Sequence, residues 1–157
     1  GSGQVNNSTS IADGLKSDTS SYSSSMSNAE KLEYVIYCAQ NQLGKPYVYG
    51  ATGMSSFDCS GLTYYAFRQI SITLPRTAQS QGYDSDFQQI SSVSNLERGD
   101  LVFFNTVSDS DQCDHTGIYL GDGWFIHASS GQDRVVVSTL ASGYYNRVFS
   151  WGRRVLG

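Results

Sequence analysis

A cysteine at the predicted start of a helix is the residue of this sequence best placed to act as a nucleophile. Cys59 lies in residues 57–62, FDCSGL, where a loop rich in Gly and Ser leads into an apolar run. The first turn of a helix favours the thiolate, the nucleophilic form of cysteine, through the backbone dipole and unpaired N–H groups. Free cysteine is also a common small core residue, so a buried and inert Cys59 is the alternative.

The sequence contains two histidines, His115 and His127. A cysteine nucleophile needs a general base, and the pKa of histidine lies nearest to neutrality. The base in turn needs a partner that fixes its tautomer. Because the two histidines bracket one predicted hairpin, the pattern favours a joint role over two unrelated residues. A zinc site formed by Cys59, His115, His127 and a water is a further alternative, but no Cys-x-x-Cys or His-x-x-x-His spacing supports it.

The turn between the two predicted strands decides whether the histidines can work together, because side chains alternate between the faces of a sheet. A two-residue turn at residues 122–123 is the stronger sequence signal, yet it would place His115 and His127 on opposite faces. A three-residue turn at 121–123, or a bulge that restores the same parity, makes the two imidazoles diagonal neighbours on one face. We predict the second arrangement, with both imidazoles facing Cys59 across a cleft.

Four residues near Cys59 could contact a substrate. Asp58 can cap the helix, which is worth ~1 kcal/mol, or hold a substrate ammonium beside the thiolate. Tyr47 and Tyr49 alternate in residues 46–50, PYVYG, and either pack on the core or line the cleft. Arg76 follows Leu74 and Pro75 and can pair with an acidic substrate group or with Asp58.

Length and composition limit the possible classes of protein. The 157 residues suit one domain, and 39% hydrophobic and 13% aromatic residues are enough for a packed core. A net charge of −4 without a basic run argues against nucleic-acid binding. No apolar stretch reaches the ~20 residues that span a bilayer.

Hydrophobic periodicity predicts helices first and strands afterwards. Apolar residues at helical spacing over 32–43 predict a helix capped at Ser27 or Asn28 and ended by Gly44. Residues 62–70 predict a second, buried helix, and a polar stretch without predicted structure continues to Gln89. Short β-type runs follow at 101–104, 117–120, 124–126, 135–137 and 148–151. This order predicts an α+β fold, an antiparallel sheet with helices packed on one face.

The domain is predicted to cover residues 28–157. Residues 1–27 form a Ser-rich tract, read as a linker or tail that begins with a Gly-Ser-Gly tag remnant. We therefore expect further modules upstream. Three cysteines allow at most one disulfide, so a bridge between Cys38 and Cys113 stays open, subject to Cα atoms within ~7 Å.

Segments spread over residues 30–154 resemble, in the same order, the motifs of the NlpC-type family of bacterial cell-wall cysteine peptidases. They are 44–50 GKPYVYG, 57–62 FDCSGL, 74–76 LPR, 99–104 GDLVFF, 115–121 HTGIYLG and 126–129 IHAS. The resemblance implies a minimal papain-like fold, in which the catalytic cysteine sits on a helix packed against an antiparallel sheet that carries the histidines. It also implies hydrolysis of peptidoglycan stem peptides, most often between γ-D-glutamate and the diamino acid, without a cofactor or metal.

The same resemblance assigns roles by position. It implies that Cys59 is the nucleophile, His115 the general base, His127 the residue that orients it, and Tyr47 the active-site tyrosine. It further implies that Asp58 and Ser60 line a site for the free N-terminal L-alanine of a stem peptide. Two positions depart from the family pattern: Tyr49 replaces a frequent Trp and Ala51 a frequent Gly.

We expect a secreted, cell-wall-associated monomer whose partners are peptidoglycan stem peptides. Two alternatives remain. One is another cysteine–histidine enzyme on the same fold, an amidase or an acyltransferase. The other is a wall-binding module without catalysis.

Overall fold

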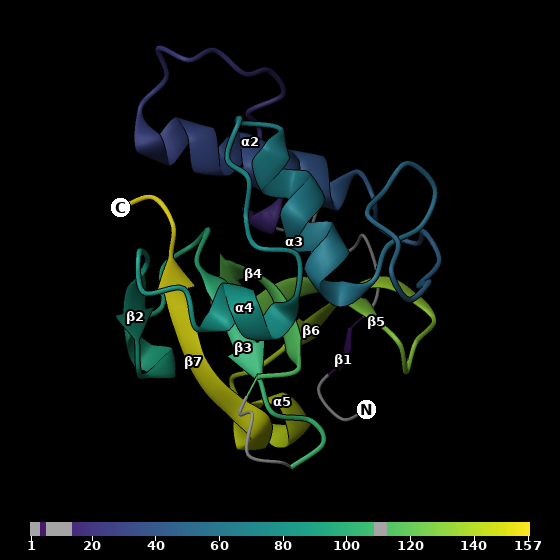
Figure 1. The fold of residues 1–157 in the computed structure, drawn as a ribbon. Coiled ribbons are helices and arrows are strands. Elements are labelled where there is room, and N and C mark those ends of the chain that lie inside the picture. Colours follow the sequence, from purple (N-terminus) through teal and green to yellow (C-terminus); the bar gives the residue numbers. More distant parts are fainter. Residues whose placement is uncertain (1–3, 6–13, 109–112) are drawn as a thin grey trace.

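The fold is a seven-stranded antiparallel sheet covered by helices, as predicted for the α+β class (Figure 1). A computed structural model describes residues 4–5, 14–108 and 113–157. The strand order is β1-β6-β5-β4-β3-β7-β2, and each neighbouring pair is antiparallel. The strands are β1 (Gln4–Val5), β2 (Gln88–Ile90), β3 (Leu101–Phe104), β4 (His115–Gly121), β5 (Trp124–Ser129), β6 (Arg134–Thr139) and β7 (Phe149–Arg154).

Two helices lie between β1 and β2 in the chain, at the positions that the apolar spacing predicts. They are α2 (Asn28–Gln40) and α3 (Cys59–Arg68). α2 begins with a capping box, in which Ser27 and Glu30 satisfy each other's backbone N–H groups. Three short helical elements complete the described chain: α4 (Ala78–Gly82), the 3₁₀ turn η2 (Val93–Asn95) and α5 (Gly143–Val148).

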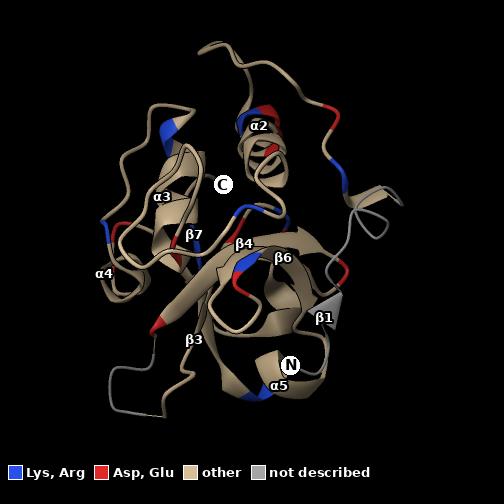
Figure 2. Cartoon of the chain, turned by 90° about the vertical axis from the view of Figure 1, so that its right-hand side faces the viewer, with Lys and Arg blue, Asp and Glu red and all other residues tan. Residues whose placement is uncertain are grey.

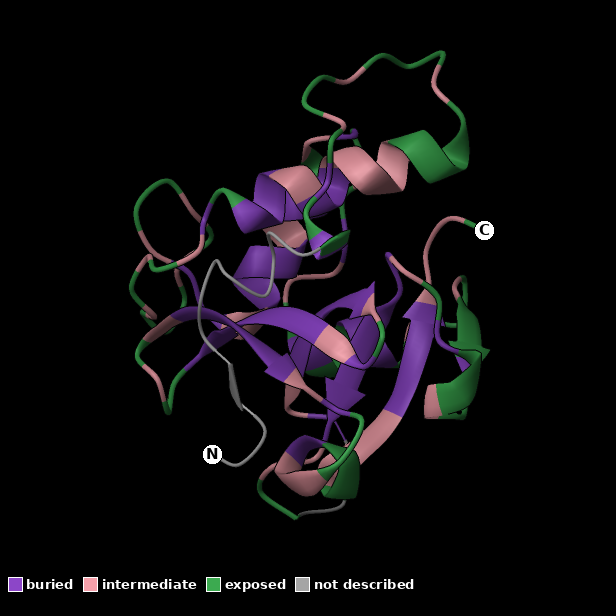
Figure 3. Cartoon of the chain, turned by 180° about the vertical axis from the view of Figure 1, so that it is seen from behind, coloured by how far each residue is buried: buried purple, intermediate pink, exposed green. Residues whose placement is uncertain are grey.

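Apolar residues are buried on both faces of the sheet, and its central strands are mostly purple in Figure 3. One face packs against α2 and α3 through residues such as Ile36 and Phe67. The other face forms a second cluster that includes Phe104, Phe125 and, from α5, Tyr145. The prediction of helices on one face alone is therefore wrong. The six residues of α5 are too few for a helical period to show in the sequence.

The polar stretch after Arg76 contains a helix that the sequence did not predict. Its buried residue Gln81 donates from Nε2 to the carbonyl oxygens of Pro75 at 2.8 Å and Ser60 at 3.2 Å. Its Oε1 accepts from Thr63 Oγ1 at 2.8 Å. One buried amide therefore fastens α4 to the first turns of α3, and a buried polar group of this kind has no hydrophobic signature.

Part of the Ser-rich N-terminal tract packs on the domain. Leu15 belongs to the core, and its carbonyl accepts from Gln40 Nε2 at 3.0 Å. The Ser17 N–H donates to Gln40 Oε1, also at 3.0 Å. The start of the tract at residues 1–3 and residues 6–13 lie outside the described residues.

The β4–β5 hairpin places His115 and His127 on the same face of the sheet, as predicted. It does so through a bulge and not through a three-residue turn. Asp122 and Gly123 form a two-residue turn with positive φ angles of 53° and 86°. Gly121 pairs with Trp124, but the register then shifts so that Tyr119 pairs with Phe125 and Ile118 with Ile126. Leu120 is the extra residue of the bulge. The shift brings His115 and His127 to the same face.

Cys38, Cys59 and Cys113 form no disulfide with one another, so the bridge between Cys38 and Cys113 that the sequence left open is not made. Cys113 is buried, with Sγ 3.9 Å from the Ala78 carbonyl oxygen and 3.8 Å from that of Gln79.

Charged residues are scattered over helices and loops (Figure 2). Among the described residues, none of the helices combines the length and apolarity needed to cross a membrane.

Gly117 allows the close approach of β4 and β5 beside the histidines. A Cβ at this position would lie 2.6 Å from the Ile126 carbonyl oxygen and 3.0 Å from His127 Cβ.

We predict that Gly117→Ala lowers the free energy of unfolding by about 1–3 kcal/mol, because the backbone oxygen of Ile126 cannot move aside as a flexible side chain can. Urea unfolding measures the change. Gly131→Ala is the control, since its nearest neighbour is Ser129 Oγ at 3.8 Å; equal stability losses in the two variants would contradict the prediction.

Candidate active site

Cys59 is the first residue of α3, and the residue before it fixes where this helix begins. Asp58 is extended and its Oδ1 accepts the Gly61 N–H at 2.7 Å, an N-cap interaction. Cys59 Sγ lies 4.0 Å from the Asp114 carbonyl oxygen, and the Thr116 backbone N–H also faces it. The thiol is thus brought against the backbone on either side of His115.

The Cys59 thiol is protonated at neutral pH. Burial raises its pKa to about 11, the nearby negative charge of Asp58 acts in the same direction, and the N–H groups of Thr116 and Ser60 oppose both. The N–H groups at the helix start favour the thiolate, as the sequence predicts, but they do not set the balance in the free protein. Desolvation outweighs the helix terminus, so a base must remove the thiol proton during reaction.

The two histidines form a hydrogen-bonded pair, as predicted from the hairpin parity. His115 Nε2 and His127 Nδ1 are 2.7 Å apart. His127 Nε2 is in turn 2.8 Å from Ser138 Oγ on β6. The chain of contacts therefore runs from His115 through His127 to Ser138, across three neighbouring strands.

The direction of these hydrogen bonds follows from the role of a base. If His115 is to accept a proton on Nδ1, its Nε2 must carry the hydrogen and donate to His127 Nδ1. His127 must then be protonated on Nε2 and donate to the Ser138 hydroxyl oxygen. In that arrangement Ser138 is the acceptor at the end of the chain, and it supports the tautomers that leave His115 Nδ1 as the base.

Aromatic side chains surround the two histidines. The ring centroid of His127 lies 4.4 Å from that of Phe125 and 5.2 Å from that of Tyr145. The ring centroid of His115 lies 5.9 Å from that of Phe104. This burial lowers the pKa of His115 to about 4, although the Asp114 carboxylate acts in the opposite direction. Burial also holds the pKa of His127 well below its usual value. Both imidazoles are therefore neutral at pH 7.

Sequence reasoning missed Ser138 and Tyr145. Ser138 could have been found from strand alternation, because it pairs with Phe125, which is two residues from His127 on the same face. Tyr145 lies on α5 and gave no such signal.

The zinc alternative finds no support in this arrangement. Both ring nitrogens of His127 already have hydrogen-bond partners. In the part of the chain that the structure describes, no group of three or more His, Cys, Asp or Glu side chains could hold a metal ion.

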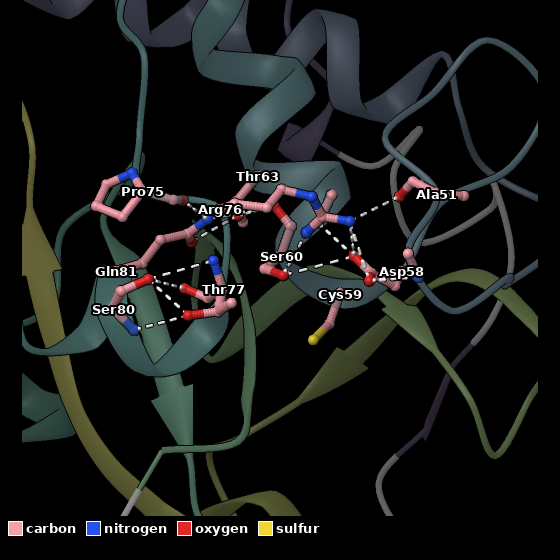
Figure 4. Close-up of polar contacts among 12 residues, drawn as sticks. Ala51, Asp58, Cys59, Ser60, Thr63, Pro75, Arg76, Thr77, Ser80 and Gln81 are labelled. Atoms are coloured by element: carbon pink, nitrogen blue, oxygen red, sulfur yellow. Dashed lines mark hydrogen bonds and ion pairs between the residues drawn. The ribbon is translucent and has the colours of Figure 1, made fainter.

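Asp58 pairs with Arg76, the second of the two partners considered for this arginine (Figure 4). Arg76 Nη2 donates to Asp58 Oδ1 at 3.0 Å and Oδ2 at 3.1 Å, and Nη1 donates to Ser60 Oγ at 2.8 Å. Asp58 Oδ2 also accepts the Gly50 N–H at 2.8 Å. One carboxylate thereby joins α3, the loop before it and the segment before α4.

Two cavities are lined by residues at the start of β4. A cleft of about 410 Å³ contains all of the sequence-predicted site residues except the histidines: Tyr47, Tyr49, Asp58, Cys59, Ser60 and Arg76. A second cavity of about 310 Å³ is lined by His115, Tyr145 and polar residues that include Ser129 and Gln132. Asp114 lines the first cavity and His115 the second.

The cysteine, the histidine pair and the cleft lie within a region that matches a known family. Residues 44–154 match the sequence profile of the NlpC/P60 family. The chain belongs to the NlpC/P60 family. The NlpC/P60 region contains Tyr47, Cys59, His115, His127 and Ser138, and it spans every strand of the sheet from β2 to β7.

Curated relatives and solved structures of NlpC/P60 proteins resemble this chain. The probable endopeptidase YafL of Escherichia coli is 40% identical over 79% of this chain and 50% of its own length. The murein DD-endopeptidase MepH of E. coli is 38% identical over 73% of this chain and 42% of its own length. The structure of the peptidoglycan hydrolase RipB from Mycobacterium tuberculosis is 26% identical, with a TM-score of 0.71 over 83% of this chain and 67% of RipB. The chain therefore spans half or less of the two curated relatives.

The raised pKa of Cys59 predicts slow alkylation at neutral pH. We expect the iodoacetamide reaction rate at Cys59, followed by mass spectrometry of its peptide, to keep rising up to about pH 11. Asp58→Asn should shift this profile to lower pH, because a negative charge beside the thiolate is removed. Asp86→Asn, an exposed carboxylate elsewhere, is the control. A rate that levels off at or below pH 7 would show a preformed thiolate instead.

The tautomer argument predicts that Ser138 is a positioning residue. Ser138→Ala should lower kcat on a muropeptide by about 10–100-fold and change the ¹⁵N shifts that report the His127 tautomer. Thr139→Ala, which removes the hydroxyl of the next residue of β6, should change neither. Unchanged tautomers in Ser138→Ala would remove Ser138 from the site, whatever happens to stability.

Proposed function

We propose that this protein is a cysteine endopeptidase that cleaves the stem peptides of peptidoglycan. The observation that carries the proposal is the hydrogen-bonded His115–His127–Ser138 chain, which starts one residue after Asp114, whose carbonyl oxygen lies 4.0 Å from Cys59 Sγ. The endopeptidase relatives and the fold shared with a peptidoglycan hydrolase support it.

The proposed reaction is acyl transfer through Cys59. His115 takes the thiol proton. Forming a thiolate from a thiol with a raised pKa and an imidazolium from an imidazole with a lowered pKa costs free energy. The attraction between the thiolate and the imidazolium offsets part of this cost. The thiolate adds to the scissile carbonyl carbon. The Cys59 backbone N–H, which as the first of α3 has no acceptor within the helix, stabilises the oxyanion, together with the Tyr47 hydroxyl. Burial raises the pKa of Tyr47, which keeps that hydroxyl protonated.

His115 also completes the reaction. It donates its proton to the leaving amine, and the C–N bond breaks to leave a thioester on Cys59. The neutral imidazole then takes a proton from water, which hydrolyses the thioester and restores the thiol. Each step uses the Nδ1 atom that the His127 and Ser138 contacts leave available.

The bond that we propose is the one between γ-D-glutamate and the diamino acid, as the sequence resemblance implies. A second candidate is the D-alanyl cross-link, because MepH is a murein DD-endopeptidase.

Secretion and association with the cell wall complete the proposal, since peptidoglycan lies outside the cell membrane. We further propose a monomeric catalytic domain with other modules upstream.

Muropeptides of known composition distinguish the two bonds. We predict that a monomeric disaccharide-tetrapeptide yields a disaccharide-dipeptide that ends in D-glutamate, identified by mass spectrometry. If the cross-link is the target, dimers are split into monomers and the monomers stay intact. A cut between sugar and L-alanine would identify an amidase, and binding to peptidoglycan without any new terminus would identify a non-catalytic module.

Substitution of Cys59 tests the nucleophile. We predict that Cys59→Ala and Cys59→Ser each lower kcat by about 10⁴-fold or more while the urea midpoint stays near that of the wild type. Chelators should leave the wild-type rate unchanged. Unchanged turnover in either variant would refute the cysteine mechanism, and a loss with chelator that zinc restores would favour a metal mechanism.

A further inference from the structure

Thr116 carries a buried hydroxyl that has no hydrogen-bond partner among the described residues. The residue is 0% exposed, and its Oγ1 neither donates nor accepts there. Thr63 is equally buried, but its Oγ1 lies 2.8 Å from Gln81 Oε1 and 3.0 Å from the Ser60 carbonyl oxygen. An unsatisfied buried polar group destabilises a fold, so valine, which has nearly the same shape, would be the more stable residue at position 116. The hydroxyl of Thr116 therefore needs an explanation other than stability.

The side chain of Thr116 faces the side of the sheet that α3 covers. Side chains alternate along β4, so Thr116 shares a face with Ile118 and Leu120, which belong to the core cluster beneath α2 and α3. His115 points to the opposite face, among the aromatic residues of the second cluster. Because α3 packs against β4, the hydroxyl lies on the side from which Cys59 approaches this strand.

The backbone of Thr116 already contacts the nucleophile. Its N–H faces Cys59 Sγ and lowers the pKa of the thiol. The hydroxyl is three covalent bonds away from this nitrogen, and rotation about χ1 moves it between staggered positions while the backbone stays in place. One residue therefore presents two donors, a fixed N–H and a rotatable O–H, beside the start of α3.

The charge on Cys59 decides whether this hydroxyl has an acceptor. Burial raises the pKa of the thiol to about 11, so the sulfur is neutral at rest. A neutral thiol is a weak acceptor, which accounts for the unpaired Thr116 hydroxyl in the resting protein. A thiolate is a charged acceptor, and hydrogen bonds to charged groups are roughly twice as strong as those between neutral groups.

We propose that Thr116 is a further catalytic residue, whose hydroxyl donates a hydrogen bond to the Cys59 thiolate after His115 has taken the proton. No covalent bond changes in this step, because the hydroxyl keeps its hydrogen and gains an acceptor. The unpaired hydroxyl destabilises the resting protein and its hydrogen bond stabilises the ionised one, so both effects make ionisation of Cys59 easier. The proposal rests on the proposed function, in which Cys59 is the nucleophile.

Thr116→Val tests the proposal, because it removes the hydroxyl and keeps the shape of the side chain. We expect the rate of iodoacetamide alkylation at Cys59, measured at about pH 9, to fall about tenfold, which corresponds to a rise of about one unit in the pKa of the thiol. The kcat on a muropeptide should fall by a similar factor, while the urea midpoint rises. Thr116→Ser, which keeps the hydroxyl, should retain the wild-type alkylation rate and kcat.

Two buried or half-buried threonines provide controls. Thr63→Val should lower the urea midpoint, since that hydroxyl has partners. Thr139→Val, on β6, removes a hydroxyl that lies 3.2 Å from the Gly123 carbonyl oxygen and should leave the alkylation rate unchanged.

Three outcomes would overturn the role of Thr116. They are a wild-type alkylation rate in Thr116→Val, a tenfold loss that Thr116→Ser shares, and a lower urea midpoint in Thr116→Val, which would show that the hydroxyl has a partner at rest. These outcomes leave the proposed function intact as long as Cys59→Ala is inactive. If Cys59→Ala keeps its turnover, the proposed function fails, and this inference fails with it.

Discussion

The carboxylate of Asp58 joins the segments on which the site depends. It caps α3, accepts from the loop that carries Tyr47 and Tyr49, and pairs with Arg76 from the segment before α4. A buried carboxylate needs such partners, since an unpaired charge in the interior is costly. Cys59 is adjacent to it, so the same contacts that satisfy this charge determine where the nucleophile lies. Burial and the Asp58 charge raise the pKa of the thiol, whereas the Arg76 charge lowers it, so the proposed reaction depends on a base.

The base is positioned by a different set of constraints, on the other side of the sheet. The thiol comes from the helical layer, whereas the imidazoles extend among the aromatic residues of the second core cluster. The two sets come together at the start of β4, where the backbone flanking His115 lies against Cys59. The bulge at Leu120 and the absence of a side chain at Gly117 make this possible, because they set the register and spacing of β4 and β5.

Burial gives the site its resting state. A thiol with a raised pKa and a base with a lowered one are both neutral, so charge appears only when substrate is attacked. The His127–Ser138 contact is in place before that moment, as are the groups proposed as oxyanion donors. In the proposed reaction the site therefore stabilises charges that develop in the transition state, which is the form of binding that accelerates a chemical step.

The sequence by itself determined the parts of this protein that depend on local pattern. Apolar spacing and caps located α2 and α3, and short β-type runs located the main strands. The requirement that two histidines share a face predicted a bulge or a longer turn. The motif residues pointed to the family. Each of these rests on neighbours in the chain, whose spacing is visible in the sequence.

Only the tertiary structure decided the contacts between distant segments. Gln81 holds α4 against α3, Ser138 forms a hydrogen bond with His127, and Arg76 pairs with Asp58. Each is a polar contact between distant segments, which produces no periodic pattern in the sequence. The protonation state of Cys59 was likewise undecided, because helix position and burial act in opposite directions. Burial belongs to the whole fold, and here it is the larger effect.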